Sequence, residues 1–172
     1  LVGLHFHLGS SIFEVEPYLT AVNVILDFAA AAKQKYRFEM KKLDIGGGFA
    51  VQYTLDKPAP PTSVFAEAVT SAIIVKCGEL NISIPRLIVE PGREIVAQAG
   101  VALYRVGVVK DIPGVRCYVS VDGGMGDNIR YALYDAKHEA LVANRTLAKD
   151  TVKVTIAGKF CESGDILIRD IN

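Results

Sequence analysis

The sequence lacks the features that would assign it at once to a nucleic-acid-binding or a membrane class. It has 19 Lys+Arg and 19 Asp+Glu, so its formal net charge is +0 and no overall attraction to nucleic acid or anionic lipid is expected. No apolar run approaches the roughly 18 residues that a membrane-spanning helix needs. The 172 residues are 51% hydrophobic, which is typical of a globular protein with a substantial core. We therefore expect no nucleic-acid partner and no membrane partner.

Cysteine is also scarce, with only Cys77, Cys117 and Cys161. An odd, scattered set predicts neither a disulfide framework nor a zinc cluster, so no metal site is expected, and it favours a reducing compartment. We expect the cytoplasm, or a plastid if the source is a plant. The sequence has no initiator Met and no signal pattern, and both ends fall in strand-like runs. This predicts that the chain is part of a longer protein.

The most informative stretch runs from Arg86 to Arg93. Its β-branched run from Leu87 to Val89 predicts a buried strand, which ends in Glu90 and a Pro-Gly turn directly before Arg93. A carboxylate and a guanidinium therefore lie at the carboxyl end of a strand, where parallel α/β folds bind ligands. The alternative is a local Glu–Arg ion pair.

The first half of the chain alternates between strand and helix patterns. Strands are expected at 1–6, 42–45 and 86–90, and helices from Pro17 onward and over about 63–76, with Gly78 as a helix stop. This alternation predicts a parallel α/β fold. Because each strand ends in polar residues or glycine, we expect residues 1–97 to be the C-terminal part of a (β/α)₈ TIM-like barrel, whose full length is about 250 residues.

The second half changes to β-runs separated by turns. Strands are expected at 101–109, 115–121, 152–156 and 166–168, with a turn at 111–114. We therefore expect residues 98–172 to begin a mostly antiparallel β domain that is incomplete in this chain.

Four further motifs carry candidate chemistry, each with an ordinary structural alternative. His7 can stack on a planar ligand and Ser10 can bind phosphate, or His7 is a half-buried histidine with its polar atoms satisfied. Gly46-Gly47-Gly48 lets backbone N–H groups approach an anion, or is simply a tight turn. The motif lacks the spacing of a dinucleotide fingerprint and the Lys of a P-loop.

The other two motifs lie in the second half. Arg130 and Tyr134, four residues apart, can bind an anionic substrate end, or belong to a solvated loop. Cys161 precedes Glu162, and a neighbouring carboxylate raises the pKa of a thiol, which suits a proton donor better than a nucleophile. The alternative is an ordinary loop cysteine.

Taken in order, five motifs resemble those of the diaminopimelate decarboxylases, which are alanine-racemase-like (fold-type III) pyridoxal-phosphate enzymes. The motifs are LHFHLGS, LDIGGGF, EPGR, VDGGMGDNIRYALY and FCESGD, and they extend from Leu4 to Asp165. Ornithine and arginine decarboxylases share the first three, whereas the last two motifs point to diaminopimelate.

The resemblance implies a pyridoxal 5′-phosphate site in the first half. His7 would stack on the cofactor ring, Ser10 would bind its phosphate, and Glu90 would pair with the pyridine nitrogen and keep it protonated. The glycine turn and the segment from Pro91 to Arg93 would complete the phosphate cradle. The implied cofactor-binding residues are His7, Ser10, Gly46, Gly47, Gly48, Glu90, Pro91, Gly92 and Arg93.

The resemblance also implies a catalytic residue and a substrate site. Cys161 would return a proton to the substrate Cα. The far end of the substrate would be bound by Arg93, Arg130, Tyr134 and Glu162. Diaminopimelate carries an ammonium and a carboxylate there, whereas lysine or ornithine would leave the arginines unmatched. In this family the Cys-Glu segment reaches a partner subunit's active site, so a homodimer is implied.

The chain departs from the family pattern at several positions. Ser11 stands where Gln is usual, Ala50 where Gly is common, and Gly126 where Ser or Thr is usual, while Tyr131 replaces a Pro beside Arg130. The family's Schiff-base Lys would lie before Leu1, and a late Tyr that contacts the phosphate would follow Asn172. The chain by itself is therefore not expected to be a working enzyme.

The predicted activity is decarboxylation of meso-2,6-diaminopimelate to L-lysine as part of a longer protein. Three alternatives stay open at this point. One is a decarboxylase of another basic amino acid, such as ornithine or arginine, with Tyr131 as the reason. The second is a catalytically silent homologue that binds a partner, although Glu90, Arg93 and Cys161 are then unexplained. The third is a Gly-rich phosphate-binding protein with no decarboxylase role, which leaves the Cys161-Glu162 pair unexplained.

Overall fold

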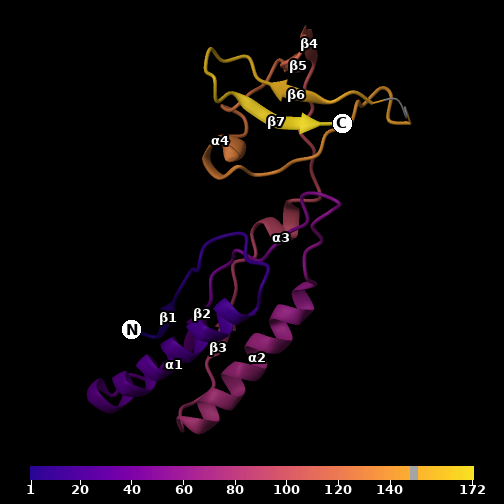
Figure 1. Cartoon of the computed structure of the whole chain (residues 1–172). Helices are drawn as coiled ribbons and strands as arrows, with labels where there is room; N and C mark the ends of the chain where they lie inside the picture. The colour runs from indigo at the N-terminus through magenta and orange to yellow at the C-terminus, as the bar shows by residue number, and fades with distance from the viewer. Residues whose placement is uncertain (148–150) are drawn as a thin grey trace. The chain divides into compact units, whose positions relative to one another are not determined.

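The structure, a computed structural model, describes residues 1–147 and 151–172. The chain divides into two compact units, whose elements are labelled in Figure 1. Unit 1 comprises residues 1–52 and 58–100, and unit 2 comprises residues 53–57 and 101–172. The short segment 53–57 thus belongs with the second half of the chain, which linear sequence reasoning did not anticipate.

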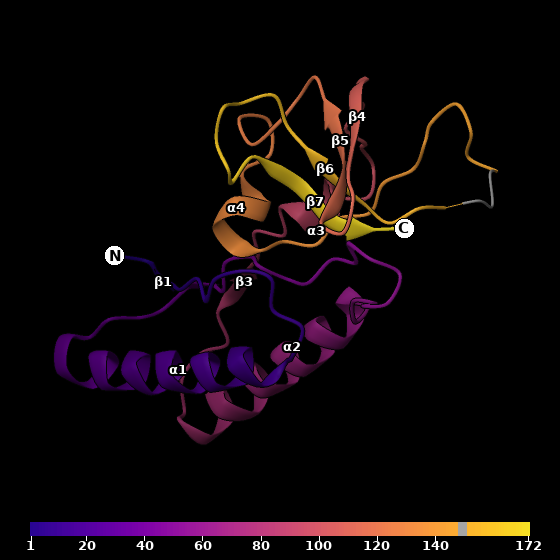
Figure 2. The same ribbon diagram turned by 45° about the horizontal axis from the view of Figure 1, so that its top comes forward.

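Unit 1 is a parallel α/β unit, as the alternating pattern predicted. Its strands lie in the order β1-β2-β3, and both pairings are parallel and in register, so that Leu4, Leu43 and Leu87 form one row across the sheet. Figure 2 shows both long helices on the same side of this sheet. The elements are β1 (Gly3–His5), α1 (Glu16–Tyr36), β2 (Lys42–Asp44), α2 (Thr62–Glu79), β3 (Arg86–Ile88) and the short α3 (Arg93–Val96).

Helix α1 forms where the apolar spacing predicted it. Pro17 occupies the first turn, where its missing N–H costs no hydrogen bond, and Tyr18, Val22 and Leu26 on its inner face are fully buried. The helix ends at Arg37, whose left-handed backbone (φ 55°) lets its N–H bond to the carbonyl of Lys33.

Helix α2 runs longer than the sequence predicted, so the expected stop at Gly78 is wrong. Gly78 lies inside the helix, which continues through Glu79. The left-handed residue that follows the helix is instead Asn81 (φ 53°), and asparagine tolerates that conformation better than most side chains. A glycine near a helix end is therefore an ambiguous stop signal when an asparagine follows.

The core of unit 1 packs the helices against β2. The Tyr18 ring stacks on Phe49 with centroids 5.2 Å apart and meets the edge of Phe65 at 5.8 Å, and Leu43 of the same cluster is fully buried. Each such side chain contributes about 1.5–3 kcal/mol through burial. Because side chains alternate along a strand, His5 and Asp44 point to the sheet face opposite Leu43 and the helices.

Unit 2 contains a four-stranded sheet in the order β4-β5-β6-β7. The pairings β4–β5 and β6–β7 are antiparallel, while β5–β6 is parallel, so the sheet is mixed with a majority of antiparallel pairings. Its elements are β4 (Val106–Ile112), β5 (Arg116–Val121), α4 (Arg130–Tyr134), β6 (Val154–Ala157) and β7 (Ile166–Ile171).

The expected strand at 101–109 begins later than predicted, at Val106. Val101 and Leu103 are 95% and 79% exposed, and the pairing of β4 with β5 starts at Val106. Arg105 instead exchanges hydrogen bonds with Asp122: its N–H donates to Oδ1 at 2.8 Å and its carbonyl accepts from the Asp122 N–H at 3.1 Å. Sequence propensity alone could not anticipate this, because strand formation depends on the partner.

No helix within residues 1–147 and 151–172 is long and apolar enough to cross a membrane. The three cysteines are free thiols, buried at Cys77, half-buried at Cys117 and exposed at Cys161. Burial raises the pKa of the Cys77 thiol.

The glycine turn after β2 leads to the first testable prediction. A Cβ at Gly47 would collide with the carbonyl oxygen of Glu90, so Gly47→Ala forces the two loops apart and is expected to destabilise the protein by about 1–3 kcal/mol. The matched control is Gly78→Ala inside α2, where nothing lies within 4 Å of the added atom. That control should stabilise by about 0.5–1 kcal/mol. Urea unfolding measures both, and equal effects would refute the close approach at Gly47.

Candidate active site

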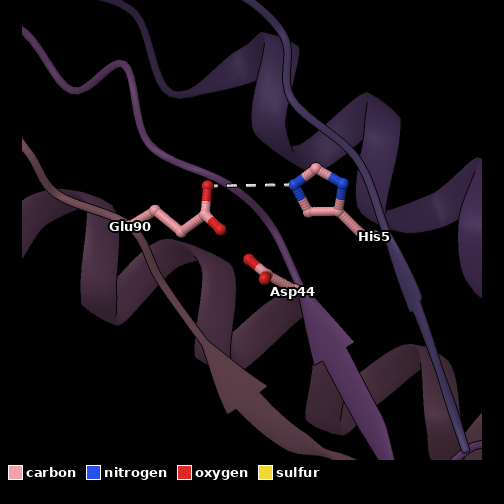
Figure 3. Close-up of side chains that lie close together, drawn as sticks. All are labelled: His5, Asp44 and Glu90. Atoms are coloured by element: carbon pink, nitrogen blue, oxygen red, sulfur yellow. Dashed lines mark ion pairs between the residues drawn. The ribbon is translucent and has the colours of Figure 1, made fainter.

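The carboxyl ends of the three parallel strands bring His5, Asp44 and Glu90 together. One ring nitrogen of His5 and one carboxylate oxygen from each of the two acids all lie within 4.8 Å of one another. His5 Nε2 is 3.9 Å from Glu90 Oε2. Figure 3 shows the three side chains pointing toward one another. His5 is the last residue of β1 and is paired in register with Asp44 at the end of β2, while Glu90 lies two residues beyond β3. Because His5 and Glu90 are exposed, both can reach a ligand.

The glycine turn that follows β2 is fixed by side chains from three directions. Asp44 Oδ1 accepts a hydrogen bond from the Gly46 N–H at 2.9 Å, and His7 Nδ1 accepts one from the Gly47 N–H at 3.3 Å. The buried Tyr18 hydroxyl donates to the Gly47 carbonyl at 2.9 Å, and burial raises the pKa of Tyr18. His7 is thus an acceptor at Nδ1, which orients its ring beside the turn.

Ser10 and Arg93 are 83 residues apart in the chain and are hydrogen-bonded in the structure, with the guanidinium Nη2 donating to the Ser10 hydroxyl. Arg93 is the first residue of α3 and follows Gly92, whose φ of 32° turns the chain after β3. A guanidinium beside a hydroxyl is suited to binding phosphate or carboxylate. The structure thus brings Ser10 and Arg93 together, and their binding of an anion stays a prediction.

In unit 2, the predicted pair Arg130 and Tyr134 is brought together on α4. The Arg130 guanidinium carbon lies 5.4 Å from the centre of the Tyr134 ring and 5.8 Å from that of Tyr53. Arg130 Nε is shielded from solvent and has no hydrogen-bond partner among the described residues. Buried polar groups are nearly always hydrogen-bonded, so a donor left unmatched here suits a carboxylate ligand.

His138 borders this guanidinium. Its ring meets the edge of Tyr53 at 6.0 Å, and its Nε2 lies 3.3 Å from Asn128 Nδ2. Burial, and secondarily the positive charge of Arg130, lower the pKa of His138, opposing a hydrogen bond with the Ala136 backbone that raises it. The lowered pKa favours a neutral imidazole beside Arg130.

Cys161 and Glu162 lie in an exposed turn of unit 2. The Glu162 carboxylate accepts hydrogen bonds from the Gly164 N–H at 3.2 Å and the Ser163 hydroxyl at 3.1 Å. These bonds, the Gly164 backbone first, lower the pKa of Glu162. The carboxylate therefore stays ionised and can pair with an ammonium group, while the neighbouring thiol is accessible.

Tyr131, which replaces the usual Pro, contacts strand β7 of unit 2. Its ring lies beneath Arg169 of β7, with 5.9 Å between the guanidinium carbon and the ring centre, whereas Arg130 lies over Tyr134 and Tyr53. Consecutive residues of a helix point in different directions, so Tyr131 packs on the sheet of unit 2 and Arg130 does not.

Sequence reasoning missed four side chains of these groups: His5, Asp44, Tyr53 and His138. His5 and Asp44 carried a usable signal, because each is a polar residue at the end of a strand, directly after a leucine that faces the helices. Tyr53 and His138 carried none, because their positions depend on how distant loops meet.

Comparison with known proteins identifies the family. The family model described as "Pyridoxal-dependent decarboxylase, pyridoxal binding domain" matches residues 1–97. The chain belongs to the pyridoxal-dependent decarboxylases. Their pyridoxal-binding domain therefore covers all of the strand ends described above, and the resemblance noted in the sequence is confirmed.

Individual decarboxylases of this family resemble the chain over almost its whole length. It is 44% identical to the diaminopimelate decarboxylase of Bacillus subtilis over 100% of the chain and 39% of that protein. It is 43% identical to that of Bacillus methanolicus over 99% of the chain and 40% of that protein. A crystal structure of diaminopimelate decarboxylase from M. jannaschii matches with a TM-score of 0.86 at 33% identity, covering 99% of the chain and 38% of that structure. The chain thus spans about 40% of the length of these relatives.

The residues at the strand ends fit a pyridoxal-type cofactor. A carboxylate at Glu90 suits a protonated ring nitrogen, the hydrogen-bonded Ser10 and Arg93 suit a phosphate, and the imidazole of His7 is oriented beside the glycine turn.

Proposed function

We propose that the whole protein to which this chain belongs decarboxylates meso-2,6-diaminopimelate to L-lysine with pyridoxal 5′-phosphate. The observation that carries the proposal is the gathering of Glu90, Ser10 and Arg93 at the carboxyl ends of three parallel strands. The identity of 40–44% to three diaminopimelate decarboxylases over nearly the whole chain supports the choice of substrate.

In this proposal, residues of unit 1 bind and tune the cofactor. Pyridoxal phosphate, when bound, supplies a protonated pyridine ring that takes up the electron pair left when the Cα–carboxylate bond breaks. Glu90 keeps the ring nitrogen protonated, because an adjacent negative charge favours the charged form of a base. Ser10, Arg93 and the N–H groups of the glycine turn hold the phosphate, with His7 against the ring.

Residues of unit 2 would select the substrate. The distal end of diaminopimelate carries a carboxylate and an ammonium, which Arg130 and Glu162 match in charge, with Tyr134 beside the guanidinium. Arg93, which carries the same charge as Arg130, is the proposed second partner for the substrate. Lysine and ornithine lack the distal carboxylate and would leave Arg130 Nε unmatched, which sites of this kind penalise.

The same proposal covers the architecture of the whole protein. We propose that residues 1–97 are consecutive (β/α) units from the C-terminal part of a (β/α)₈ barrel, and that residues 98–172 begin its β domain. Three in-register parallel strands with both helices on one face support this. A homodimer, in which the Cys161 segment serves the partner subunit's site, is part of the proposal.

Arg130→Met tests the proposed specificity. It is expected to lower kcat/KM for diaminopimelate by about 10⁴-fold while changing the residual activity on lysine little, because only the first substrate has a distal carboxylate to lose. Arg145→Met, at an exposed position of the same unit, removes an equal charge and should leave both values unchanged. Steady-state CO₂ release measures kcat/KM for diaminopimelate and for lysine in each variant. A uniform loss on both substrates would contradict the role of Arg130.

A further inference from the structure

Asp165 is the one charged residue among the buried side chains of the described chain, with only 2% of its surface exposed. The uncharged side chain of Thr155 is also buried. Removing a carboxylate from water is costly unless hydrogen bonds replace its hydration. A buried aspartate therefore needs strong hydrogen-bond donors around its carboxylate.

Those partners are backbone N–H groups of two separate loops. Asp165 Oδ1 accepts from the Met125 N–H at 2.6 Å, and Oδ2 accepts from the Phe160 N–H at 2.7 Å. Both distances are shorter than the usual 2.9–3.0 Å of an N–H···O bond, as expected when the acceptor is charged. Each oxygen of the carboxylate thus holds a different loop.

The two loops are built closely around this carboxylate. A Cβ at Gly124 would come within 2.7 Å of Asp165 Oδ1, and one at Gly158 would collide with the carboxylate outright. Two hydrogen bonds between main-chain groups add to this packing. The Gly158 N–H donates to the Asp165 carbonyl at 2.8 Å, and the Lys159 N–H donates to the Gly123 carbonyl at 2.9 Å. Side chains at these glycines would displace the carboxylate from both loops.

Each loop carries a residue assigned above to substrate or chemistry. The first, residues 123–128, leads directly into α4, where Asn128 Oδ1 accepts from the Arg130 N–H at 3.2 Å. The second, residues 160–164, carries Cys161 and Glu162, and the Asp165 N–H donates back to the Glu162 carbonyl at 3.0 Å. Because both loops are bound to one carboxylate, displacing that carboxylate moves both.

We propose that Asp165 is a positioning residue that fixes the Arg130 loop and the Cys161 loop of unit 2 in a single arrangement. This inference rests on the proposed function for its catalytic consequence. The clamp itself, meaning the two hydrogen bonds from the Met125 and Phe160 N–H groups to the Asp165 carboxylate, lies within unit 2. Asp165 touches neither substrate nor cofactor in this account, and acts only through the two backbone N–H groups.

The test is Asp165→Asn in the whole protein. Asparagine keeps one acceptor oxygen but turns an NH₂ group toward the second N–H donor, so the side chain is pushed out of its place and the hydrogen bonds to both loops are disturbed. We expect KM for diaminopimelate to rise through Arg130 and kcat to fall through Cys161, with kcat/KM reduced about 100-fold, since displacements of about 1 Å cost that much. Thr155→Val is the matched control. It removes the buried hydroxyl that bonds Asp170 in the same sheet and touches neither loop.

Hydrogen exchange of the Met125 and Phe160 N–H groups provides a readout that does not depend on activity. In the wild-type protein both should exchange slowly, and Asp165→Asn should accelerate them in both loops, whereas Thr155→Val should accelerate neither. Unchanged exchange in Asp165→Asn, or rapid exchange of both groups in the wild type, would overturn the clamp. If the wild type releases no CO₂, the proposed function fails, while the exchange result still decides the clamp. Should Asp165→Asn not fold, exchange in the wild type alone decides it.

Discussion

In the whole protein, replacing Cys161 with Ala is expected to lower kcat for the proposed decarboxylation by about 10²- to 10⁴-fold, the usual contribution of a positioned general acid. Loss of CO₂ breaks the bond between Cα and its carboxylate and leaves the electron pair on Cα, which must then accept a proton. The exposed Cys161 thiol supplies that proton in this account, and Ala has none to give. The affinity for pyridoxal phosphate should be unchanged, because no cofactor-binding role is assigned to Cys161.

Cys117→Ala is the matched control for this experiment. It makes the same chemical change, the loss of a thiol, at a half-buried position on β5 to which no chemical role is assigned. Rapid-quench measurement of CO₂ release gives kcat, and titration of the cofactor-free protein gives cofactor affinity. If Cys161→Ala weakened cofactor binding as much as turnover, the residue would be structural and the proton-donor role would be wrong.

Glu90→Gln is expected to reduce kcat on the order of 10²- to 10³-fold, the range found when one electrostatic stabiliser of a developing charge is removed. Glutamine keeps the shape of the side chain and can still form a hydrogen bond, but it carries no charge to keep the ring nitrogen protonated. Substrate binding should change little, because Glu90 is assigned to the cofactor. His5, which lies 3.9 Å from Glu90, loses its ion-pair partner in the same variant.

The control is Glu94→Gln, four residues further along. It makes the same chemical change, and the new amide can still accept the hydrogen bond from the Thr62 hydroxyl. Comparing kcat and KM of the two variants separates the loss of a specific charge from a general change in net charge. Turnover that stays at the wild-type level in Glu90→Gln would count against the electron-sink argument.

The sequence was sufficient for the parts of the fold that depend on local periodicity. The stripe from Tyr18 to Leu26 and the apolar runs at Leu43 and Leu87 predicted α1 and the parallel strands, because their burial follows directly from the repeat of each element. The positions of element ends were less predictable. Helix α2 continues past Gly78 to Glu79, and β4 begins only at Val106 although the apolar run starts at Val101.

For the candidate site, the sequence supplied some of the candidate residues but none of the contacts between them. Motif order identified Ser10, Glu90 and Arg93, yet only the fold revealed that Glu90 faces His5 and that Arg93 bonds Ser10. Asp165 was part of a recognised motif, but its role as a buried acceptor for two loops depends on tertiary structure. Contacts between loops distant in sequence leave no periodic pattern, and so are not read from the sequence alone.

The most direct test of the central claim is CO₂ release by the whole protein with added pyridoxal phosphate. Meso-diaminopimelate, lysine, ornithine and arginine are offered separately at equal concentration. The account predicts release from diaminopimelate at a kcat/KM far above that for the other three, because only diaminopimelate carries both the distal carboxylate and the ammonium that Arg130 and Glu162 match. Release from another amino acid alone would contradict the assigned substrate, and release from none would contradict the decarboxylase function.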